Sequence, residues 1–292
     1  MPPVEESKKK ASILVEALPY VRRFRGSIFV VKYGGSFMDS PDPEVRSRVA
    51  QDLVFLHFVG IKVVVVHGGG KAVTRTLSAK GIEAKFIDGL RVTDKQTIDV
   101  VDEVLNGSVN KEVASFVSNY DCDIQRIAGK TVLDCSKLQH NPDLGYVGEV
   151  RSVKTQPILD ALDKGAMPIL SSTGSDEKGQ CYNVNADTAA AQVAIALNAR
   201  RLVYLSDVPG LLRNPNDLNS LLSSLPVDQV KPLIKEGVIA QGMLPKVNSA
   251  VNALNEGVNR VHFIDGRLAH SILLEIFTDK GIGTEIIHSK TF

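Results

Sequence analysis

Residues 62–70 read KVVVVHGGG, a run of four valines that leads into three successive glycines. The apolar run is far shorter than the roughly 20 residues that cross a bilayer, and its β-branched side chains favour a buried strand. Three glycines weaken helices and strands alike, so a purely structural turn explains them poorly. Successive backbone N–H groups in such a turn form a concave anion site. The stretch therefore predicts an α/β sheet with an anion-binding loop at a strand end.

The same order of β-branched run, glycine and helical pattern recurs along the chain. We therefore expect an α/β fold with an open, largely parallel twisted sheet sandwiched between helices. The candidate strands are residues 28–32, 62–67, 124–128, 148–154, 167–171, 201–206 and 260–264. The candidate helices are residues 43–58, 72–80, 93–105, 188–197 and 245–256. Short alternating runs between residues 121 and 154 predict antiparallel hairpins at one edge or mouth of the sheet.

A helical pattern with its own apolar stripe precedes the first strand, within residues 12–24. Pro19 lies inside it and predicts a kink. The apolar stripe must pack against another surface, which belongs either to the same subunit or to a partner. Residues 176–179 are the best candidate for a connection between two lobes. We expect three parts: a kinked N-terminal helix at residues 1–25, an N-terminal lobe at 26–178 and a C-terminal lobe at 179–292.

Composition narrows the class of protein. The 292 residues are 43% apolar and 23% charged, and 34 Lys and Arg face 33 Asp and Glu, so the chain lacks the basic excess of a nucleic-acid binder. Its polar start resembles neither a signal peptide nor a membrane span. Cys122, Cys135 and Cys181 are too few and too irregularly spaced for a disulfide framework or a zinc site. We expect a cytoplasmic protein without nucleic-acid or membrane partners.

A second glycine turn follows the first candidate strand. There Lys32 precedes Gly34 and Gly35 at the carboxyl end of a strand, where ligands bind in open α/β sheets. Taken alone, this turn is equally consistent with a tight strand-to-helix connection and a solvated lysine. Two such turns on neighbouring strands favour an anion site. The common phosphate motifs fail, because Val73 breaks the dinucleotide fingerprint and Ile124 breaks the P-loop.

Three polar segments follow in the second half of the chain. In the segment NVNAD, an extended backbone would point Asn183, Asn185 and Asp187 to one side, and Asp187 stands where a helix N-cap is expected. This row either positions a polar substrate or only caps the helix. Residues 206–211 leave a strand in a Ser-Asp-Val-Pro-Gly turn. Lys246 opens a helix, where the macrodipole disfavours a cation unless an anion lies nearby.

Together these motifs resemble those of the amino acid kinase family, from about residue 11 to residue 290. The motifs are KYGG at 32–35, HGGG at 67–70, GLRVT at 89–93, NVNAD at 183–187, SDVPG at 206–210 and GMLPK at 242–246. It is their combination and order, and no single motif, that carries the resemblance. Within the family it favours the members that transfer the γ-phosphate of ATP to the γ-carboxylate of N-acetyl-L-glutamate in arginine biosynthesis.

The resemblance implies a role for each motif. Lys32 and Lys246 would stabilise the transferring phosphoryl group, and Asp187 would hold both lysines. The implied substrate-binding residues are Gly69, Gly70, Arg91, Asn183 and Asn185. The implied nucleotide-binding residues are Gly34, Gly35, Gly68, Ser206, Asp207, Val208, Gly210 and Leu211. The N-terminal lobe would bind the amino acid and dimerise, the C-terminal lobe would bind ATP, and Mg²⁺ would enter with ATP rather than at a metal site of the protein.

The chemistry of such an acceptor fits these residues. A glutamate-type carboxylate has a pKa near 4.3, so it is an ionised nucleophile at neutral pH and needs no general base. The reaction needs instead fixed positive groups that relieve the repulsion between two anions. Arg91 is suited to a bidentate clamp on a carboxylate. His57, His67 and the three cysteines receive no role.

The two ends of the chain resemble those of the arginine-inhibited members of the family. This resemblance implies feedback inhibition by L-arginine, and N-terminal helices that interlace dimers into a hexameric ring, a trimer of dimers. The implied effector residues are Tyr20, His270, Glu275, Gly281 and Gly283, with Glu275 suited to pair with a guanidinium. A PII-type signalling protein is a further candidate partner, for which the sequence holds no readable motif.

Three alternatives remain open. The first is another member of the family, which acts on carbamate, aspartate, glutamate or uridylate; the chain has no room for the regulatory domains of aspartate kinases. The second is a catalytically silent amino-acid sensor, which would have no reason to keep two lysines with Asp187. The third is a nicotinamide-dependent oxidoreductase, which the missing dinucleotide fingerprint disfavours.

Overall fold

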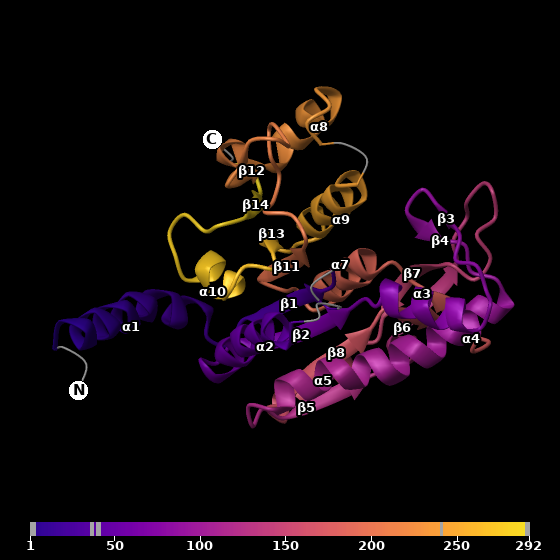
Figure 1. Ribbon diagram of the computed structural model, residues 1–292, viewed down its shortest axis with the longest axis horizontal. Helices are drawn as coiled ribbons and strands as arrows, with labels where there is room; N and C mark the ends of the chain where they lie inside the picture. Colours follow the sequence, from indigo (N-terminus) through magenta and orange to yellow (C-terminus); the bar gives the residue numbers. More distant parts are fainter. Residues whose placement is uncertain (1–3, 36–37, 39–41, 240–241, 290–292) are drawn as a thin grey trace.

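A mixed, mostly parallel eight-stranded sheet forms the centre of the computed structural model, which describes residues 4–35, 38, 42–239 and 242–289 (Figure 1). The strand order is β12-β14-β13-β11-β1-β2-β8-β5, and neighbours are parallel except β13 and β14. The strands are β1 (Ile28–Tyr33), β2 (Lys62–His67), β5 (Ile124–Ile127), β8 (Met167–Ser171), β11 (Arg201–Ser206), β12 (Ser224–Pro226), β13 (Arg260–Asp265) and β14 (Thr284–Ile287). This confirms the predicted α/β class.

The valine run of β2 is buried on both faces of this sheet. Val64 and Val66 belong to a first apolar cluster, whereas Val63 and Val65 belong to a second. Successive strand residues point to opposite faces, so an uninterrupted apolar run serves two cores at once. Burial of each such side chain contributes about 1.5–3 kcal/mol to folding.

Helices cover both faces of the sheet. The first cluster packs against α6 (Gln156–Asp163), α7 (Ala186–Ala196), α8 (Val227–Lys235) and α9 (Leu244–Asn255). The second packs against α2 (Pro43–Phe58), α3 (Gly70–Ala79), α4 (Lys95–Glu103), α5 (Asn110–Ser118) and α10 (Ser271–Ile276). Helices on both sides are what a parallel sheet requires, because its crossover connections run over its faces.

The predicted helix at residues 93–105 is longer and more irregular than its pattern indicates. Helix α4 continues into a π-helical segment, η2 (Val104–Val109), and then directly into α5. The wider π turn shifts the side chains that follow, so the 3.6-residue pattern breaks near residue 105. Helices α5, α6, α8 and α10 are absent from the predicted set.

A smaller sheet lies beside the main one, with the order β10-β9-β6-β7. It comprises β6 (Leu133–Lys137), β7 (Gly148–Val153), β9 (Thr173–Ser175) and β10 (Cys181–Asn183). The antiparallel pair β6–β7 confirms the predicted hairpin, but residues 124–127 form β5, which pairs in parallel with β8. Residues 176–179 form the turn between β9 and β10, so the predicted lobe boundary falls inside one hairpin.

Short elements complete the described chain. A two-stranded hairpin joins β3 (Phe86–Ile87) to β4 (Leu90–Arg91). Two single 3₁₀ turns, η3 (Gly129–Thr131) and η4 (Leu218–Ser220), connect longer elements. Within the described ranges, no helix is both long and apolar enough to cross a membrane.

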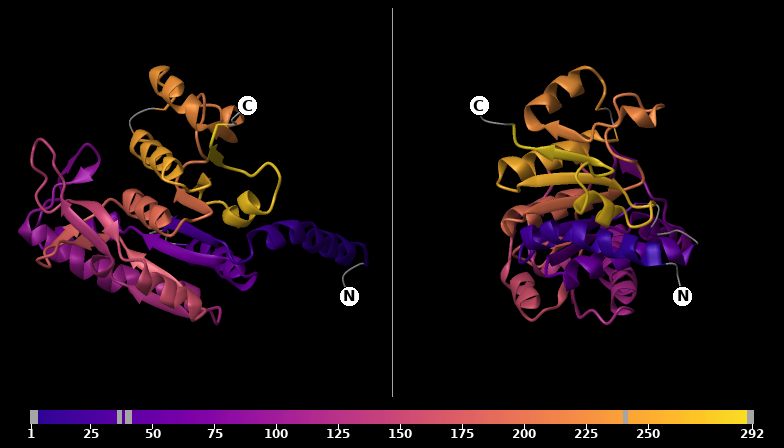
Figure 2. Two further views of the ribbon diagram at one scale, coloured as in Figure 1. Left: turned by 180° about the vertical axis from the view of Figure 1, so that it is seen from behind. Right: turned by 90° about the vertical axis from the view of Figure 1, so that its left-hand side faces the viewer.

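The N-terminal helix α1 (Val4–Phe24) projects from the body, with the N-terminus at its far end (Figures 1 and 2). Its last turn is anchored, because Phe24 is buried and packs edge-on against Phe29 at a centroid distance of 5.3 Å. The apolar side chains before that turn are exposed: Val4, Ile13, Leu14, Val15 and Leu18. The stripe therefore does not fold back on its own subunit. The helix is continuous through Pro19, and the kink there stays a prediction.

Candidate active site

Lys32, Asp187 and Lys246 form a buried group of three charges, which we call the triad. One Asp187 oxygen, Oδ1, lies 3.0 Å from Lys32 Nζ, and the other, Oδ2, lies 2.5 Å from Lys246 Nζ. The Lys32 and Asp187 side chains are only 9% and 13% exposed. Burial lowers the pKa of Lys32, and the charge of Asp187 opposes that effect. Burial alone would raise the pKa of Asp187, but the two ammonium groups bring it below its usual range.

Three elements bring the triad together. Lys32 lies at the carboxyl end of β1, Asp187 in the first turn of α7 and Lys246 in the first turn of α9. The α7 macrodipole favours a carboxylate in that turn. The start of α9 disfavours a cation, and Asp187 supplies the nearby anion that the sequence analysis required there. The two helix ends therefore fit around one ion-pair network.

The N-cap of α7 is Asn185, which corrects the prediction that Asp187 caps this helix. The Asn185 side chain accepts hydrogen bonds from the backbone N–H groups of Asp187 and Thr188. Asp187 is already inside the helix, so Asn183, Asn185 and Asp187 do not form one extended row. The reason is local: Asn185 is the last residue with an extended backbone, and helical geometry turns Asp187 toward the lysines.

The two glycine turns lie side by side at the carboxyl ends of β1 and β2. The backbone N–H of Gly68 donates to the carbonyl of Tyr33 at 3.0 Å. A Cβ atom on Gly34 would lie 2.6 Å from Lys32 Nζ, so only glycine leaves that ammonium its position. Gly69 has a φ of 156°, and a Cβ there would lie 2.7 Å from a methyl group of Leu105. Close approach therefore explains why these positions are glycine.

A small cavity of about 160 Å³, the glycine pocket, adjoins the second turn. All the predicted substrate-binding residues line it: Gly69, Gly70, Arg91, Asn183 and Asn185. Gly68, predicted for the nucleotide, lies here as well. Apolar side chains that the sequence analysis did not identify complete the wall: Val73, Phe86, Leu90, Val101, Leu105 and Val147. They belong to patterns that indicate only core positions.

Arg91 presents a free edge of its guanidinium to this region. Its Nη2 donates to the Gly70 carbonyl at 2.7 Å and to Thr74 at 3.0 Å, and its guanidinium lies over the Phe86 ring at 4.7 Å. The other nitrogen, Nη1, is buried without a hydrogen-bond partner among the described residues. A buried donor without a partner is costly, so this edge suits an anionic ligand.

A larger cavity of about 680 Å³, the apolar pocket, is lined by Lys32 and Lys246 of the triad. Every predicted nucleotide-binding residue except Gly68 lines it: Gly34, Gly35, Ser206, Asp207, Val208, Gly210 and Leu211. The structure adds Leu212, Pro215, Leu218, Val238 and Met243. Two of these have a sequence signal: Met243 lies in the GMLPK motif, and Leu218 is a leucine in a loop otherwise rich in Asn and Pro.

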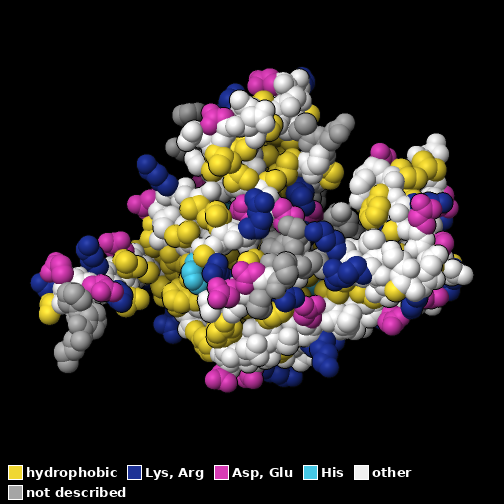
Figure 3. Space-filling view, viewed as in Figure 1, with side chains coloured by type: hydrophobic (Ala, Val, Ile, Leu, Met, Phe, Trp, Pro, Cys, Tyr) yellow, Lys and Arg dark blue, Asp and Glu magenta, His cyan; other side chains and the backbone are white. Residues whose placement is uncertain are grey.

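The space-filling view shows where these cavities open. A notch separates the part that carries α8 and α9 from the part that carries the β3–β4 hairpin, and Lys and Arg side chains gather at its base (Figure 3). Positive charge around a cleft raises the local concentration of anionic ligands. The surface therefore agrees with the anion-binding chemistry of the two turns.

A third cavity of about 670 Å³, the helix pocket, lies between the end of α1 and the last strands. Tyr20, Glu275 and Gly281 line it, as predicted for an effector site, while His270 and Gly283 are not among its lining residues. His270 instead bonds the buried carboxylate of Asp52 through Nδ1 at 2.8 Å. That carboxylate also accepts from the backbone N–H of Ile272 and so holds the start of α10.

Glu275 is more fully bonded than the sequence analysis expected. One of its oxygens lies 2.7 Å from His262 Nδ1, and the other accepts the backbone N–H groups of Ile282 and Gly283 at 2.7 and 2.9 Å. Burial would raise its pKa, but these hydrogen bonds and the His262 charge hold the pKa below the usual range. Glu275 thus orders its own loop, and the other carboxylates that line this pocket are the exposed Asp279 and the partly buried Glu285, which pairs with Arg260 at 2.6 Å.

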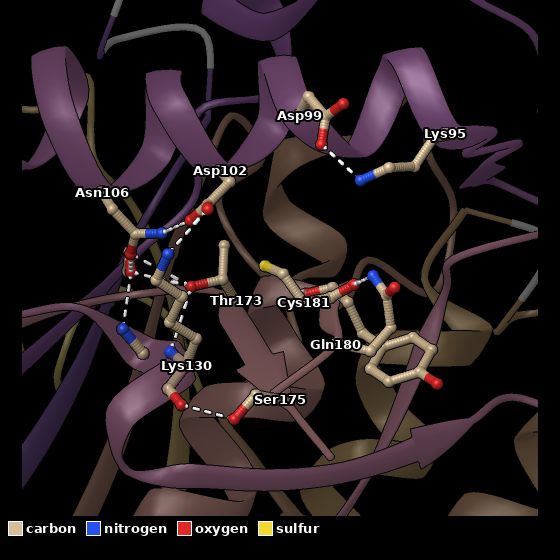
Figure 4. A network of polar contacts seen from close by, with 12 residues as sticks. Lys95, Asp99, Asp102, Asn106, Lys130, Thr173, Ser175, Gln180 and Cys181 are labelled. Atoms are coloured by element: carbon tan, nitrogen blue, oxygen red, sulfur yellow. Dashed lines mark hydrogen bonds and ion pairs between the residues drawn. The ribbon is translucent and has the colours of Figure 1, made fainter. Parts of the chain in front are cut away.

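Polar side chains fasten the π segment η2 to the smaller sheet. Asp102 accepts from Asn106 at 2.5 Å and from Lys130 at 2.6 Å (Figure 4). The Asn106 oxygen in turn accepts from Thr173 at 3.1 Å and from Ser171. Leu105, which lines the glycine pocket, is therefore flanked by two anchored residues, Asp102 three positions before it and Asn106 directly after it.

Comparisons with known proteins agree with this geometry. Residues 27–265 match the family described as Amino acid kinase family. The acetylglutamate kinase of Carboxydothermus hydrogenoformans is 46% identical over 96% of this chain and 99% of its own length, and that of Aquifex aeolicus is 43% identical over 97% and 99%.

Solved structures show the same fold. The N-acetylglutamate synthase of Neisseria gonorrhoeae, in complex with coenzyme A and N-acetyl-glutamate, matches 97% of this chain with a TM-score of 0.84 and 28% identity; the chain spans 64% of that synthase. Its complex with coenzyme A and L-arginine matches with a TM-score of 0.81. Carbamate kinase of Giardia lamblia, bound to AMP-PNP, is only 18% identical but has a TM-score of 0.67 over 90% of this chain and so shares the fold.

Burial of the triad leads to a stability prediction. The variant Asp187→Asn leaves Lys32 buried without its counter-charge, and we expect a loss of about 3 kcal/mol in the free energy of unfolding at pH 7. The control Asp163→Asn breaks an ion pair of similar length, 2.9 Å to Lys62, in which Asp163 is 70% exposed. Urea denaturation should show a loss below about 1 kcal/mol for the control. Equal losses for the two variants would contradict the assigned energetic role.

The pH dependence follows from the same ion pairs. Because the folded pKa of Asp187 lies below the unfolded value near 3.9, its contribution to stability is complete above that pH and is lost as the pH falls through the folded pKa. The stability difference between the wild type and Asp187→Asn should therefore shrink in urea titrations below about pH 4.

Proposed function

The chain belongs to the amino acid kinase family, and we propose that it phosphorylates the γ-carboxylate of N-acetyl-L-glutamate with Mg²⁺-bound ATP. The relatives named acetylglutamate kinase support this activity through their identity over nearly the whole chain. The observation that carries the proposal is the triad: its lysines line the apolar pocket, and Asn185, two residues before Asp187, lines the glycine pocket. The cytoplasmic location expected from cysteine usage is part of the same proposal.

In this proposal, the two lysines stabilise the charge that develops during transfer. Both reactants are anions, and the acceptor carboxylate, with a pKa near 4.3, attacks without a general base. A lysine at about 4 Å contributes up to roughly 4 kcal/mol at an effective dielectric constant near 20, which is around three decades in rate. Asp187 fixes the positions of both ammonium groups, so little reorganisation is needed when the charge develops.

The pockets on either side hold the reactants. The free Nη1 edge of Arg91 binds the carboxylate of the acetylated amino acid that is not phosphorylated, and Asn183 lies beside it. The glycine turns donate backbone N–H groups to the phosphate oxygens. The turn at residues 206–211 and the apolar side chains around it hold the adenine ring, and Mg²⁺ enters as part of the ATP substrate. Each lobe then carries one substrate, the amino acid in residues 26–178 and the nucleotide in residues 179–292.

The activity itself is tested by ADP release with ATP and Mg²⁺. The panel is N-acetyl-L-glutamate, L-glutamate, L-aspartate, carbamate and UMP. We expect turnover with N-acetyl-L-glutamate alone, because Arg91 and Asn183 face an acetylated amino acid in this proposal. Turnover with a different substrate would overturn the assignment of Arg91 and Asn183, and no turnover with any of them would favour an amino-acid sensor.

The lysines are tested individually. Because each ammonium supplies charge at the transferring group, Lys32→Ala and Lys246→Ala should each lower kcat by about a hundredfold or more. The matched control is Lys62→Ala. Lys62 is the first residue of β2, at the amino end of the parallel strands, and it pairs with the exposed Asp163. Steady-state kinetics on folded protein, checked by circular dichroism, would contradict the role if either triad variant lost less than tenfold.

We also propose that L-arginine inhibits the reaction from the helix pocket. Its lining combines the carboxylates of Asp279 and Glu285 with the guanidinium groups of Arg201 and Arg260, which suits a ligand that carries both charges. The synthase complex with L-arginine adds support from a related fold. Tyr20 lies on α1, donates to Asp279 and contacts Phe277, so a ligand bound in the pocket would change the contacts that hold the end of α1. The exposed apolar stripe of α1 then packs against other subunits in a hexamer, a trimer of dimers, to which a PII-type protein can dock.

Arginine sensitivity is tested by titration. Millimolar L-arginine should lower the activity of the wild type at least about fivefold, the size of an ordinary allosteric coupling, and Tyr20→Ala should remove this response by opening the pocket wall. Tyr120→Ala is the control, because Tyr120 is also half-buried but lies on the far side of α2, where it bonds Ser47. Identical rates with and without arginine in the wild type would refute the proposal.

A further inference from the structure

His67 is a fully buried histidine that the proposed reaction leaves without a role, yet it directly precedes the glycine turn. Its Nδ1 lies 2.7 Å from the carbonyl oxygen of Gly68, and its Nε2 lies 3.0 Å from Nδ2 of Asn110. A carbonyl can only accept and an amide nitrogen can only donate. The ring is therefore neutral, with its proton on Nδ1.

The orientation of the Asn110 amide is fixed independently. Its Nδ2 also donates to the Ile169 carbonyl at 3.0 Å, and its Oδ1 accepts from Arg126 Nε at 2.7 Å. A flipped amide would place oxygen against the carbonyl and nitrogen against the guanidinium, so neither contact would survive. Burial, together with the Arg126 charge, lowers the pKa of His67 to about 4, so the ring stays neutral at neutral pH.

The hydrogen bond to Gly68 determines the direction of an N–H group. In a planar trans peptide, the carbonyl and the following N–H point to opposite sides. Because His67 holds the Gly68 carbonyl toward the core, the N–H of Gly69 points away from it, toward the glycine pocket. Gly69 has no Cβ to restrict rotation of that peptide, so another contact must supply the restraint.

The π segment supplies a second restraint on the same turn. Leu105 and Val109 lie against Gly69, where a Cβ would meet them at 2.7 and 3.2 Å. Arg126 Nη2 donates to the carbonyls of Asn106 and Gly107 at 3.1 and 3.3 Å, while the Asn106 side chain is held by the network of Figure 4. Arg126 thus ties the π segment to Asn110 and, through it, to His67.

We propose that His67 and Asn110 are positioning residues that fix the Gly68–Gly69 peptide so that the Gly69 N–H donates to the transferring phosphoryl group. The inference rests on the proposed kinase function. His67 does not touch the reactants; it sets the direction of a donor that does. A misdirected donor weakens stabilisation of the transition state more than binding of the ground state, so the effect belongs in kcat rather than in KM.

Two substitutions at residue 67 separate the two hydrogen bonds. In His67→Asn the amide nitrogen can take the place of Nδ1 and still donate to Gly68, whereas in His67→Gln the amide reaches the place of Nε2 and leaves Gly68 without a donor. Both remove the ring and so share the cost of lost packing. We expect His67→Gln to lower kcat by about a hundredfold, the scale for a misplaced catalytic group, with KM for both substrates within threefold, and His67→Asn to retain kcat within about tenfold of the wild type.

A surface variant covers the case in which the residue 67 variants do not fold. Arg126 is exposed, so Arg126→Gln should leave folding intact while it releases Asn110 and the π segment. We expect kcat to fall several-fold with KM unchanged, against no change for the neighbouring control Gln125→Ala. In parallel, ¹⁵N NMR of the histidine-labelled wild type should show the neutral ring of His67 protonated at Nδ1.

The outcomes distinguish this inference from the function on which it rests. Equal kcat in His67→Asn and His67→Gln, a loss confined to KM, or no effect of Arg126→Gln would overturn the positioning role while the wild type remained active. A wild type without turnover on N-acetyl-L-glutamate would refute the proposed function instead. A ring protonated at Nε2 would overturn the positioning role in either case.

Discussion

One carboxylate shared by two ammonium groups, the buried Lys32 and the partly buried Lys246, is the constraint on which this structure depends. Asp187 lies within 3.0 Å of Lys32 and 2.5 Å of Lys246, and without it two like charges would occupy one poorly solvated site. Each partner comes from a different element, so the carboxyl end of β1 and the first turns of α7 and α9 must converge on one point. The cavities that flank the triad follow from this convergence.

The backbone beside the triad is restrained by His67 and Asn110, which line neither cavity, and by the π segment η2, whose Leu105 lines the glycine pocket. Two glycine turns meet where β1 and β2 end. Glycine allows other groups to approach their backbone closely, but it also leaves that backbone conformationally flexible. The hydrogen bonds of His67 and Asn110 and the packing of the π segment η2 restrain this flexible backbone. A π segment is a less favourable helix than the regular form, and its retention at a functional turn is the usual circumstance in which proteins keep one.

Strand β11 connects the helix pocket to the apolar pocket. It begins at Arg201 in the helix pocket and ends at Ser206 in the apolar pocket, roughly 17 Å away for a strand of this length. Asp52 adds a second link, because it lies on α2 and holds the start of α10. The wall of the helix pocket is therefore continuous, through β11, with the wall of the apolar pocket.

The sequence by itself determined the strands that carry long β-branched runs and the motifs at their ends, since periodicity and glycine placement are local properties. It also brought out Lys246, because a cation at the start of a helix conflicts with local preference unless an anion lies nearby. Lys32, Asp187 and Arg91 received their roles from the combination of motifs and its resemblance to the family. Only the tertiary structure decided that Asn185 caps α7, that Glu275 accepts hydrogen bonds from the backbone of its own loop, and that the π segment lies against Gly69. Each of these outcomes depends on which donors or side chains the folded chain brings to one atom, and hydrophobic period and glycine placement do not contain that information.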